Sequence, residues 1–119
     1  MLQLAPQSKI FLATQPVDFR KGIDSLAAFC RLKLSLDPLE GAIFAFCNRS
    51  KTSIKFLCYD GQGFWLCLKR LSSGKFQSWP NKDDRTIIQI IYREFYTIIH
   101  NGNPKGANFG DDWRPIPPS

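Results

Sequence analysis

The sequence predicts an α+β fold, in which a small antiparallel meander sheet of about four strands packs with two helices. Three observations support this prediction: short apolar runs bounded by turn residues, longer segments whose apolar residues recur at helical spacing, and a length of 119 residues. That length corresponds to one domain and can bury a substantial core without disulfides or metal ions. We therefore expect one domain over residues 1–103 and a Pro- and Gly-rich tail over residues 104–119.

The first predicted element is a strand at residues 9–14, a short apolar run bounded by prolines. A helix is expected to follow, with Asp18 as its N-cap, because its carboxylate can accept hydrogen bonds from the free amides of the first turn. The predicted helical segment ends by Asp37-Pro38, because the residue before a proline avoids helical backbone angles. Between these limits the apolar residues have helical spacing: Ile23, Leu26, Ala27, Phe29, Cys30 and Leu34.

Three strands are predicted next, at residues 42–47, 53–59 and 63–71, and they form the antiparallel meander. The sequence Asp-Gly-Gln-Gly before the third strand is a strong hairpin signal, because glycine supplies the positive φ of tight turns. Both faces of this hairpin are largely apolar, so we expect both to be covered, with one face left open for a partner as the alternative. The alternation of side chains predicts these cross-strand pairs: Tyr59 with Phe64, Leu57 with Leu66, Lys55 with Leu68, Phe56 with Cys67, Cys58 with Trp65 and Ile54 with Lys69.

A second helix is predicted in the segment of residues 85–102, with Asp83 or Asp84 as its cap and Gly102 in the position just past its last turn. The β-branched residues of this segment favour a strand, whereas its length and its caps favour a helix. We predict the helix, because its apolar residues fall on one stripe: Ile87, Ile88, Ile91, Phe95, Ile98 and Ile99.

The four cysteines, Cys30, Cys47, Cys58 and Cys67, lie in apolar settings and form no C-x-x-C pair. Since the chain has a single histidine, His100, a zinc site of the usual spacing is not expected. We therefore predict no cofactor, no metal ion, and reduced thiols in a cytoplasmic protein. The start of the chain lacks a signal-peptide pattern, and no apolar stretch reaches the roughly 20 residues of a membrane span.

Positive charge is concentrated in the middle of the chain. The formal net charge is +6, and residues 47–82 carry seven basic residues against one acid, Asp60. Clustering of this kind is what the neutralisation of nucleic-acid phosphates requires. We therefore predict that DNA contacts come from the basic side chains Arg49, Lys51, Lys55, Lys69, Arg70 and Lys75.

Two further features are candidate nucleic-acid contacts. Arg20 and Lys21 lie at the predicted start of the first helix, where a phosphate can bind, with a capped and solvated first turn as the alternative. Trp79 follows Lys75 closely and can stack on an unpaired base. The alternative for Trp79 is that it and Phe76 pin a loop to the core.

The sequence shows no convincing catalytic constellation, so we predict that the protein is not an enzyme. Metal-dependent nuclease chemistry needs several carboxylates at one site, but Asp37 precedes a proline and Asp60 belongs to a turn. Asp24 lies six positions after Asp18, so the two do not share a helical face. A small nuclease that uses Asp18, Asp24 or Asp60 remains the alternative.

Two composite motifs resemble a known family. The segment VDFRKGIDSLAAFC is similar to the D-M-R-K-G-(I/F)-D-(G/S)-L-A segment of the TnpB accessory proteins, the products of the second reading frame of insertion-sequence-66-type bacterial transposons. The segment FAFCNRSKTSIKFLCYDGQGFWLCLKRLSSGKF resembles a later block of the same family, so the likeness covers residues 4–80. The chain departs from the family where Ser50 and Ser53 replace arginines and Tyr59 replaces a tryptophan, and its F-x-W-P element is one residue longer.

The resemblance implies a helper in DNA transposition that acts beside a separate, larger transposase with an acidic catalytic triad. From the charge we infer that this chain binds the DNA of the transposon ends, the transposase, or both, and a homo-oligomer is left open. The alternative is a protein-interaction module that docks through an open apolar sheet face around Trp65, without direct DNA contact.

Overall fold

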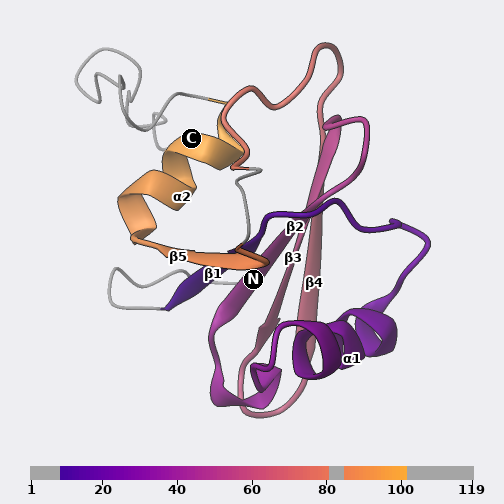
Figure 1. Cartoon of the computed structure of the whole chain (residues 1–119), viewed down its shortest axis with the longest axis vertical. Helices are drawn as coiled ribbons and strands as arrows, with labels where there is room; N and C mark the ends of the chain where they lie inside the picture. Colours follow the sequence, from indigo (N-terminus) through magenta and orange to yellow (C-terminus); the bar gives the residue numbers. More distant parts are fainter. Residues whose placement is uncertain (1–8, 81–84, 102–119) are drawn as a thin grey trace, which may run out of the picture.

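A five-stranded sheet with one helix on each face organises the chain (Figure 1). The computed structural model describes residues 9–80 and 85–101. Within these residues no helix has the length and apolar character to cross a membrane. In chain order the elements are β1 (Ile10–Ala13), α1 (Ile23–Lys33), the 3₁₀ helix η1 (Pro38–Glu40), β2 (Ile43–Cys47), β3 (Ser53–Tyr59), β4 (Phe64–Arg70), β5 (Ile87–Ile90) and α2 (Tyr92–Ile99).

The strands are arranged in the order β4-β3-β2-β1-β5. The predicted α+β class is confirmed, but the sheet has five strands, and β1 and β2 are parallel rather than antiparallel. The difference arises because the chain crosses from the end of β1 back to the start of β2 through α1, and a crossover of this kind joins parallel strands. The β2–β3 and β3–β4 pairs are antiparallel, as predicted. The pair of β1 with β5 is also antiparallel, but the sequence did not predict it.

The β3–β4 hairpin has the predicted register in each of the six specified pairs. Gly61 in its turn has φ = 95°, a conformation that glycine adopts without a steric penalty. The Asp60 carboxylate accepts hydrogen bonds from the amides of Gly63 and Gln62, each at 2.9 Å, and from the indole of Trp65 at 2.8 Å. These bonds favour the charged form, so they hold the pKa of Asp60 below its ordinary value.

The predicted helix over residues 85–102 is wrong in its first part. Ile87–Ile90 form β5, which pairs with the otherwise free edge of β1, and α2 begins only at Tyr92. Ile91 has an extended backbone, and its amide donates to the Glu94 carboxylate at 3.2 Å. The strand forms because β-branched side chains lose rotamer freedom in a helix and fit a sheet ladder well. The expected caps Asp83, Asp84 and Gly102, and the predicted tail over residues 104–119, lie outside the described residues.

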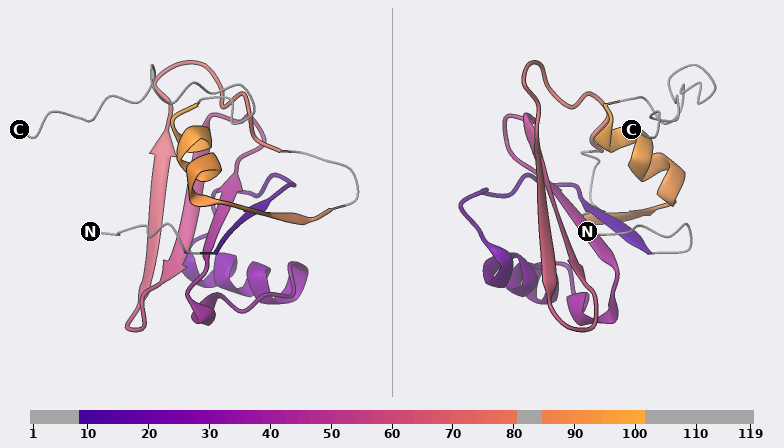
Figure 2. Two further views of the ribbon diagram at one scale, coloured as in Figure 1. Left: turned by 90° about the vertical axis from the view of Figure 1, so that its left-hand side faces the viewer. Right: turned by 180° about the vertical axis from the view of Figure 1, so that it is seen from behind.

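Both faces of the sheet are covered, as expected (Figure 2). On one face α1 packs against Phe44 and Phe46, and on the other α2 and the segment after β4 pack against Ile43 and Ala45. Successive residues of β2 thus alternate between two cores, and the whole strand is buried. Because β2 pairs with both β1 and β3, it positions the end of β1 and the start of β3, where the candidate site lies.

The four cysteines are free thiols, three of them buried and Cys67 half-buried. Burial raises the pKa of Cys30 to about 12 and that of Cys47 to about 11, and it also raises the pKa values of Cys58 and Cys67. The thiols therefore stay protonated at neutral pH and pack as small apolar groups. Cys58 and Cys67 occupy diagonal positions across β3 and β4, which follows from the predicted pairs of Cys58 with Trp65 and of Phe56 with Cys67.

Candidate nucleic-acid interface

Three connecting segments meet at the end of the sheet where β1, β2 and β4 finish and β3 begins. The Val17 amide donates to the carbonyl of Cys47 at 3.0 Å, which joins the segment after β1 to the end of β2. The Phe76 amide donates to the carbonyl of Lys51 at 2.8 Å, which joins the segment after β4 to the β2–β3 turn. We call this place the basic end of the sheet, because it carries Arg49, Lys51, Arg70 and Lys75.

Asn48 holds the β2–β3 turn in shape. Its side-chain oxygen accepts from the amides of Thr52 and Ser53 at 2.9 and 3.1 Å, and its side-chain nitrogen donates to the Thr52 hydroxyl at 3.0 Å. Lys51 completes the turn with φ = 61°, in the left-handed region. This role of Asn48 was not predicted from the sequence, although the Asn-Arg pair at the start of the β2–β3 turn was an available signal.

The cations of the basic end form no ion pairs with the described residues. Arg49, Arg70 and Lys75 are exposed and Lys51 is half-buried. Within residues 9–80 and 85–101, the single ion pair is that of Arg20 with Asp18, at 2.6 Å. The basic end therefore presents uncompensated positive charge, which is the electrostatic feature that attracts a polyanion.

Asp18 does not cap α1, so this prediction is wrong. The helix begins at Ile23 with Gly22 as its N-cap, and no side chain caps it. The Asp18 carboxylate instead accepts from both the backbone and the guanidinium of Arg20, and these bonds lower its pKa to about 2. The charge of Arg20 is thus neutralised by its neighbour Asp18. Lys21 is half-buried, and its backbone carbonyl accepts a hydrogen bond from the amine of Lys55.

Two predicted DNA contacts, Lys55 and Lys69, are engaged within the fold. The Lys55 amine donates to the carbonyls of Phe19 and Lys21 at 2.7 and 3.0 Å, and it lies 5.0 Å from the centre of the Phe19 ring. The Lys69 amine donates to the carbonyl of Ile99, in the last turn of α2, where a cation also complements the helix dipole. Both amines therefore anchor distant segments to the sheet.

We expect Lys55→Met to lower the free energy of unfolding by about 1–3 kcal/mol, because two part-buried carbonyls would lose their hydrogen-bond donor. Urea denaturation followed by circular dichroism measures this change. Lys75→Met is the matched control, since Lys75 is exposed, and its effect should stay within about 0.5 kcal/mol. Equal effects of the two substitutions would contradict the anchoring role of Lys55.

Trp79 is buried, with 5% of its surface exposed, and its indole nitrogen donates to the carbonyl of Ala13 at 3.0 Å. Phe76 beside it is 2% exposed. These two side chains hold the segment after β4 against the core, which agrees with the structural alternative for Trp79. We therefore do not retain Trp79 as a stacking platform for a base.

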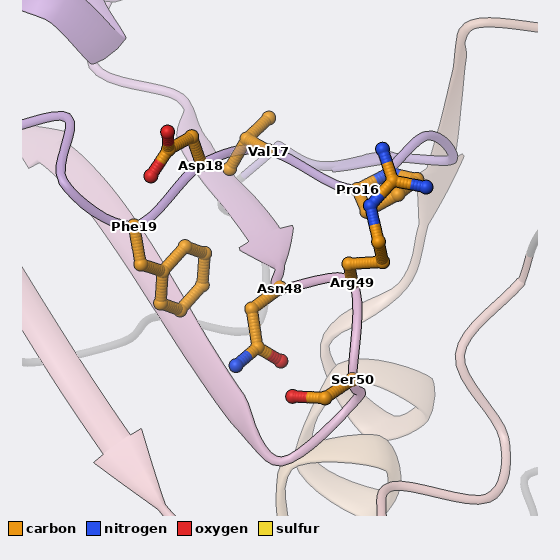
Figure 3. Close-up of a pocket in the computed structure, with 7 residues that line it drawn as sticks. All are labelled: Pro16, Val17, Asp18, Phe19, Asn48, Arg49 and Ser50. Carbon is orange, nitrogen blue, oxygen red and sulfur yellow. The ribbon is translucent and has the colours of Figure 1, made fainter.

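An open pocket of about 540 Å³ lies between the segment after β1 and the β2–β3 turn (Figure 3). A second hollow of about 240 Å³ adjoins it and reaches Lys51 and Trp79. Arg49 lines both hollows, and Figure 3 shows its guanidinium beside Pro16. The larger pocket is lined by Pro16, Val17, Asp18, Phe19, Asn48, Arg49 and Ser50.

A family model described as "IS66 Orf2 like protein" matches residues 8–106. The chain belongs to the IS66 Orf2-like family. This result confirms the resemblance that the motifs indicated and ties the chain to IS66-type insertion sequences. No solved structure matches the chain.

Two curated proteins of similar sequence come from Sinorhizobium fredii (strain NBRC 101917 / NGR234). The uncharacterized protein y4jC is 43% identical over 75 residues, which cover 63% of this chain and 64% of the relative. The uncharacterized protein y4hO is 38% identical over 87 residues, which cover 73% of this chain and 75% of the relative. The chain thus spans just under two thirds of the first relative and three quarters of the second.

The two motifs that resemble the IS66 Orf2-like family touch each other in the structure. Lys55, in the second motif, binds carbonyls of Phe19 and Lys21 in the first. Arg49, of the Asn-Arg pair in the second motif, lines the pocket with Asp18 of the first. The motif residues therefore converge on the basic end of the sheet and the pocket beside it.

Two of the three carboxylates named as alternative catalytic residues have local structural roles. Asp18 pairs with Arg20, and Asp60 organises the hairpin turn. The Asp37 carboxylate likewise accepts from the Leu39 amide at the start of η1. In the part of the chain that the structure describes, no three His, Cys, Asp or Glu residues gather as metal ligands.

Proposed function

We propose that this IS66 Orf2-like protein is an accessory factor of transposition that binds DNA through the basic end of the sheet. The observation that carries the proposal is the gathering of Arg49, Lys51, Arg70 and Lys75 at one end of the sheet, without ion pairs to the described residues. Arginine and lysine at such a surface neutralise phosphates and release counterions, which drives binding.

The turn that carries Arg49 and Lys51 is preorganised for this task. Asn48 holds it through two hydrogen bonds from backbone amides and one to the Thr52 hydroxyl, so little conformational entropy is lost when a phosphate binds. Arg49 is central, because it borders the two hollows that the phosphate backbone can approach. The proposal assigns recognition to this cytoplasmic chain and leaves the covalent steps to the separate transposase that the family resemblance implies.

Salt dependence tests this proposal. Each phosphate contact contributes about −0.9 to the slope of log K against log salt, so four contacts predict a slope of about −3 to −4. Fluorescence anisotropy with a duplex of the transposon end, titrated between roughly 50 and 200 mM NaCl, measures it. A scrambled duplex of equal length separates specific from general binding. Absence of binding at the lowest salt concentration, or a slope near zero, would contradict the proposal.

The same preparation tests the catalytic alternative. We propose that the chain does not cleave DNA, because Asp18 and Asp60, two of its three candidate carboxylates, serve the ion pair and the turn described above. The transposon-end duplex should remain intact with the protein and magnesium. Cleavage that disappears in Asp24→Asn, Asp18→Asn or Asp60→Asn would show instead that the protein is a nuclease.

A further inference from the structure

The outer edge of β4 has backbone amides and carbonyls that no described strand pairs with. β4 is the terminal strand of the sheet, and among the described residues it pairs with β3 alone (Figure 2). The Asp60 amide donates to the carbonyl of Gly63, and the Leu71 amide donates to that of Thr52, so odd-numbered positions of β4 bond to β3. Because the two sides of an antiparallel strand alternate, the amides and carbonyls of even-numbered positions point outward: Phe64, Leu66, Leu68 and Arg70.

This edge also carries exposed apolar surface. Leu68 is 60% exposed and Trp65 is 38% exposed, and they lie on opposite faces of the strand. Long edge strands with apolar side chains readily pair with another chain, and proteins that stay monomeric usually blunt them. β4 has seven residues, with charges only at positions 69 and 70.

We propose that β4 pairs antiparallel with β4 of a second copy of this chain, on a twofold axis at Cys67, to form a continuous ten-stranded sheet. This register makes hydrogen-bonded pairs of Phe64 with Arg70 and of Leu66 with Leu68 of the second copy, all of them positions with outward groups. The result is roughly eight backbone hydrogen bonds, and each residue of β4 is paired.

The side chains are complementary in this register. Leu66 faces Leu68 of the second copy, and the cation Arg70 faces the ring of Phe64. Lys69, whose amine binds the Ile99 carbonyl, places its aliphatic stem opposite Trp65. Pairs of apolar residues, and pairs of a cation with an aromatic ring, stabilise neighbouring strands.

Other twofold registers fit less well. An axis at Lys69 would place like charges directly opposite each other, which is destabilising. An axis at Leu66 would leave Lys69 and Arg70 facing the hairpin turn of the second copy. The axis at Cys67 is therefore the one that uses the full length of the strand.

This arrangement gives the dimer two DNA-binding surfaces. Antiparallel strands run in opposite directions, so the basic ends of the two copies lie at opposite ends of the joined strands. The dimer does not depend on DNA binding, and its test uses the protein alone.

Disulfide capture at Cys67 tests the register. Cys67 faces its own symmetry mate in a non-hydrogen-bonded pair, with the Cα atoms about 4.5 Å apart, within the range of a disulfide. Copper phenanthroline and oxygen would remove two electrons and two protons from the two thiols, at about pH 9 because burial raises the pKa of Cys67. We expect a dimer on a non-reducing gel for the native chain and for Cys58→Ser, and none for Cys67→Ser. A dimer that persists in Cys67→Ser, or none in the native chain, would overturn the proposal.

Light scattering after gel filtration provides the second measurement. The native chain should have twice the mass of the 13.6 kDa monomer. Leu68→Pro removes an outward amide that β3 does not use, so it should give a monomer with an unchanged circular dichroism spectrum. Leu68→Ala keeps the amide and should remain dimeric. A native monomer would overturn the proposal, and so would a folded Leu68→Pro variant that remains dimeric.

Discussion

Trp79→Ala is expected to lower the free energy of unfolding by about 3–5 kcal/mol, the usual cost of removing a large buried aromatic side chain. The Trp79 ring packs in the core cluster with Phe76 and Phe95, so its loss would leave a cavity under the segment after β4. The substitution also removes the donor to the Ala13 carbonyl at the end of β1. Urea denaturation of the native chain and the variant, followed by circular dichroism, measures the change.

Trp65→Ala is the matched control, because it removes the same side chain from a site that is 38% exposed. Its indole bonds only the exposed Asp60 carboxylate, so the expected loss is about 1 kcal/mol. The two variants should be compared at a low micromolar protein concentration, where pairing of β4 between copies contributes least to the measured stability. If Trp79→Ala were as mild as Trp65→Ala, the buried position of Trp79 would be contradicted.

The parts of the fold that depend on near neighbours in sequence could be predicted. The Asp-Gly-Gln-Gly turn and the alternation along β3 and β4 specify the register, because a slip of one residue would turn every side chain to the other face. β5 was predictable only in part. Its β-branched isoleucines favour a strand, but the free edge of β1 with which they pair lies more than 70 residues earlier in the chain. The parallel pairing of β1 with β2 likewise depends on the crossover through α1.

The candidate site was predictable in its charge but not in the role of each cation. Composition places Lys55, Lys69 and Lys75 in the same basic segment, yet Lys55 and Lys69 bind carbonyls about 30 residues or more away in the chain. Nothing local in the sequence marks those acceptors. The β2–β3 turn differs, because Asn48 holds it through neighbouring groups only, so the Asn-Arg pair is a usable local signal for the exposed Arg49.

Arg49→Gln combined with Lys75→Gln is expected to weaken binding of the transposon-end duplex roughly 10- to 100-fold at about 100 mM salt, with a salt slope reduced by about 2. Both side chains are exposed at the basic end and have no partners in the described part of the chain, so their removal should leave stability unchanged. Fluorescence anisotropy measures the affinity, and urea denaturation checks the fold.

The decisive control removes the same charge from elsewhere. Lys9→Gln combined with Arg31→Gln also replaces one lysine and one arginine, but Lys9 precedes β1 at the opposite end of the sheet and Arg31 lies in the last turn of α1. Exposed charges separated by more than about 10 Å are largely screened at 0.1 M salt, so this pair should weaken binding less than about threefold. Location, rather than net charge, then determines DNA affinity. Equal losses from the two double variants would mean that the duplex responds to overall charge, and the basic end would no longer be its binding site.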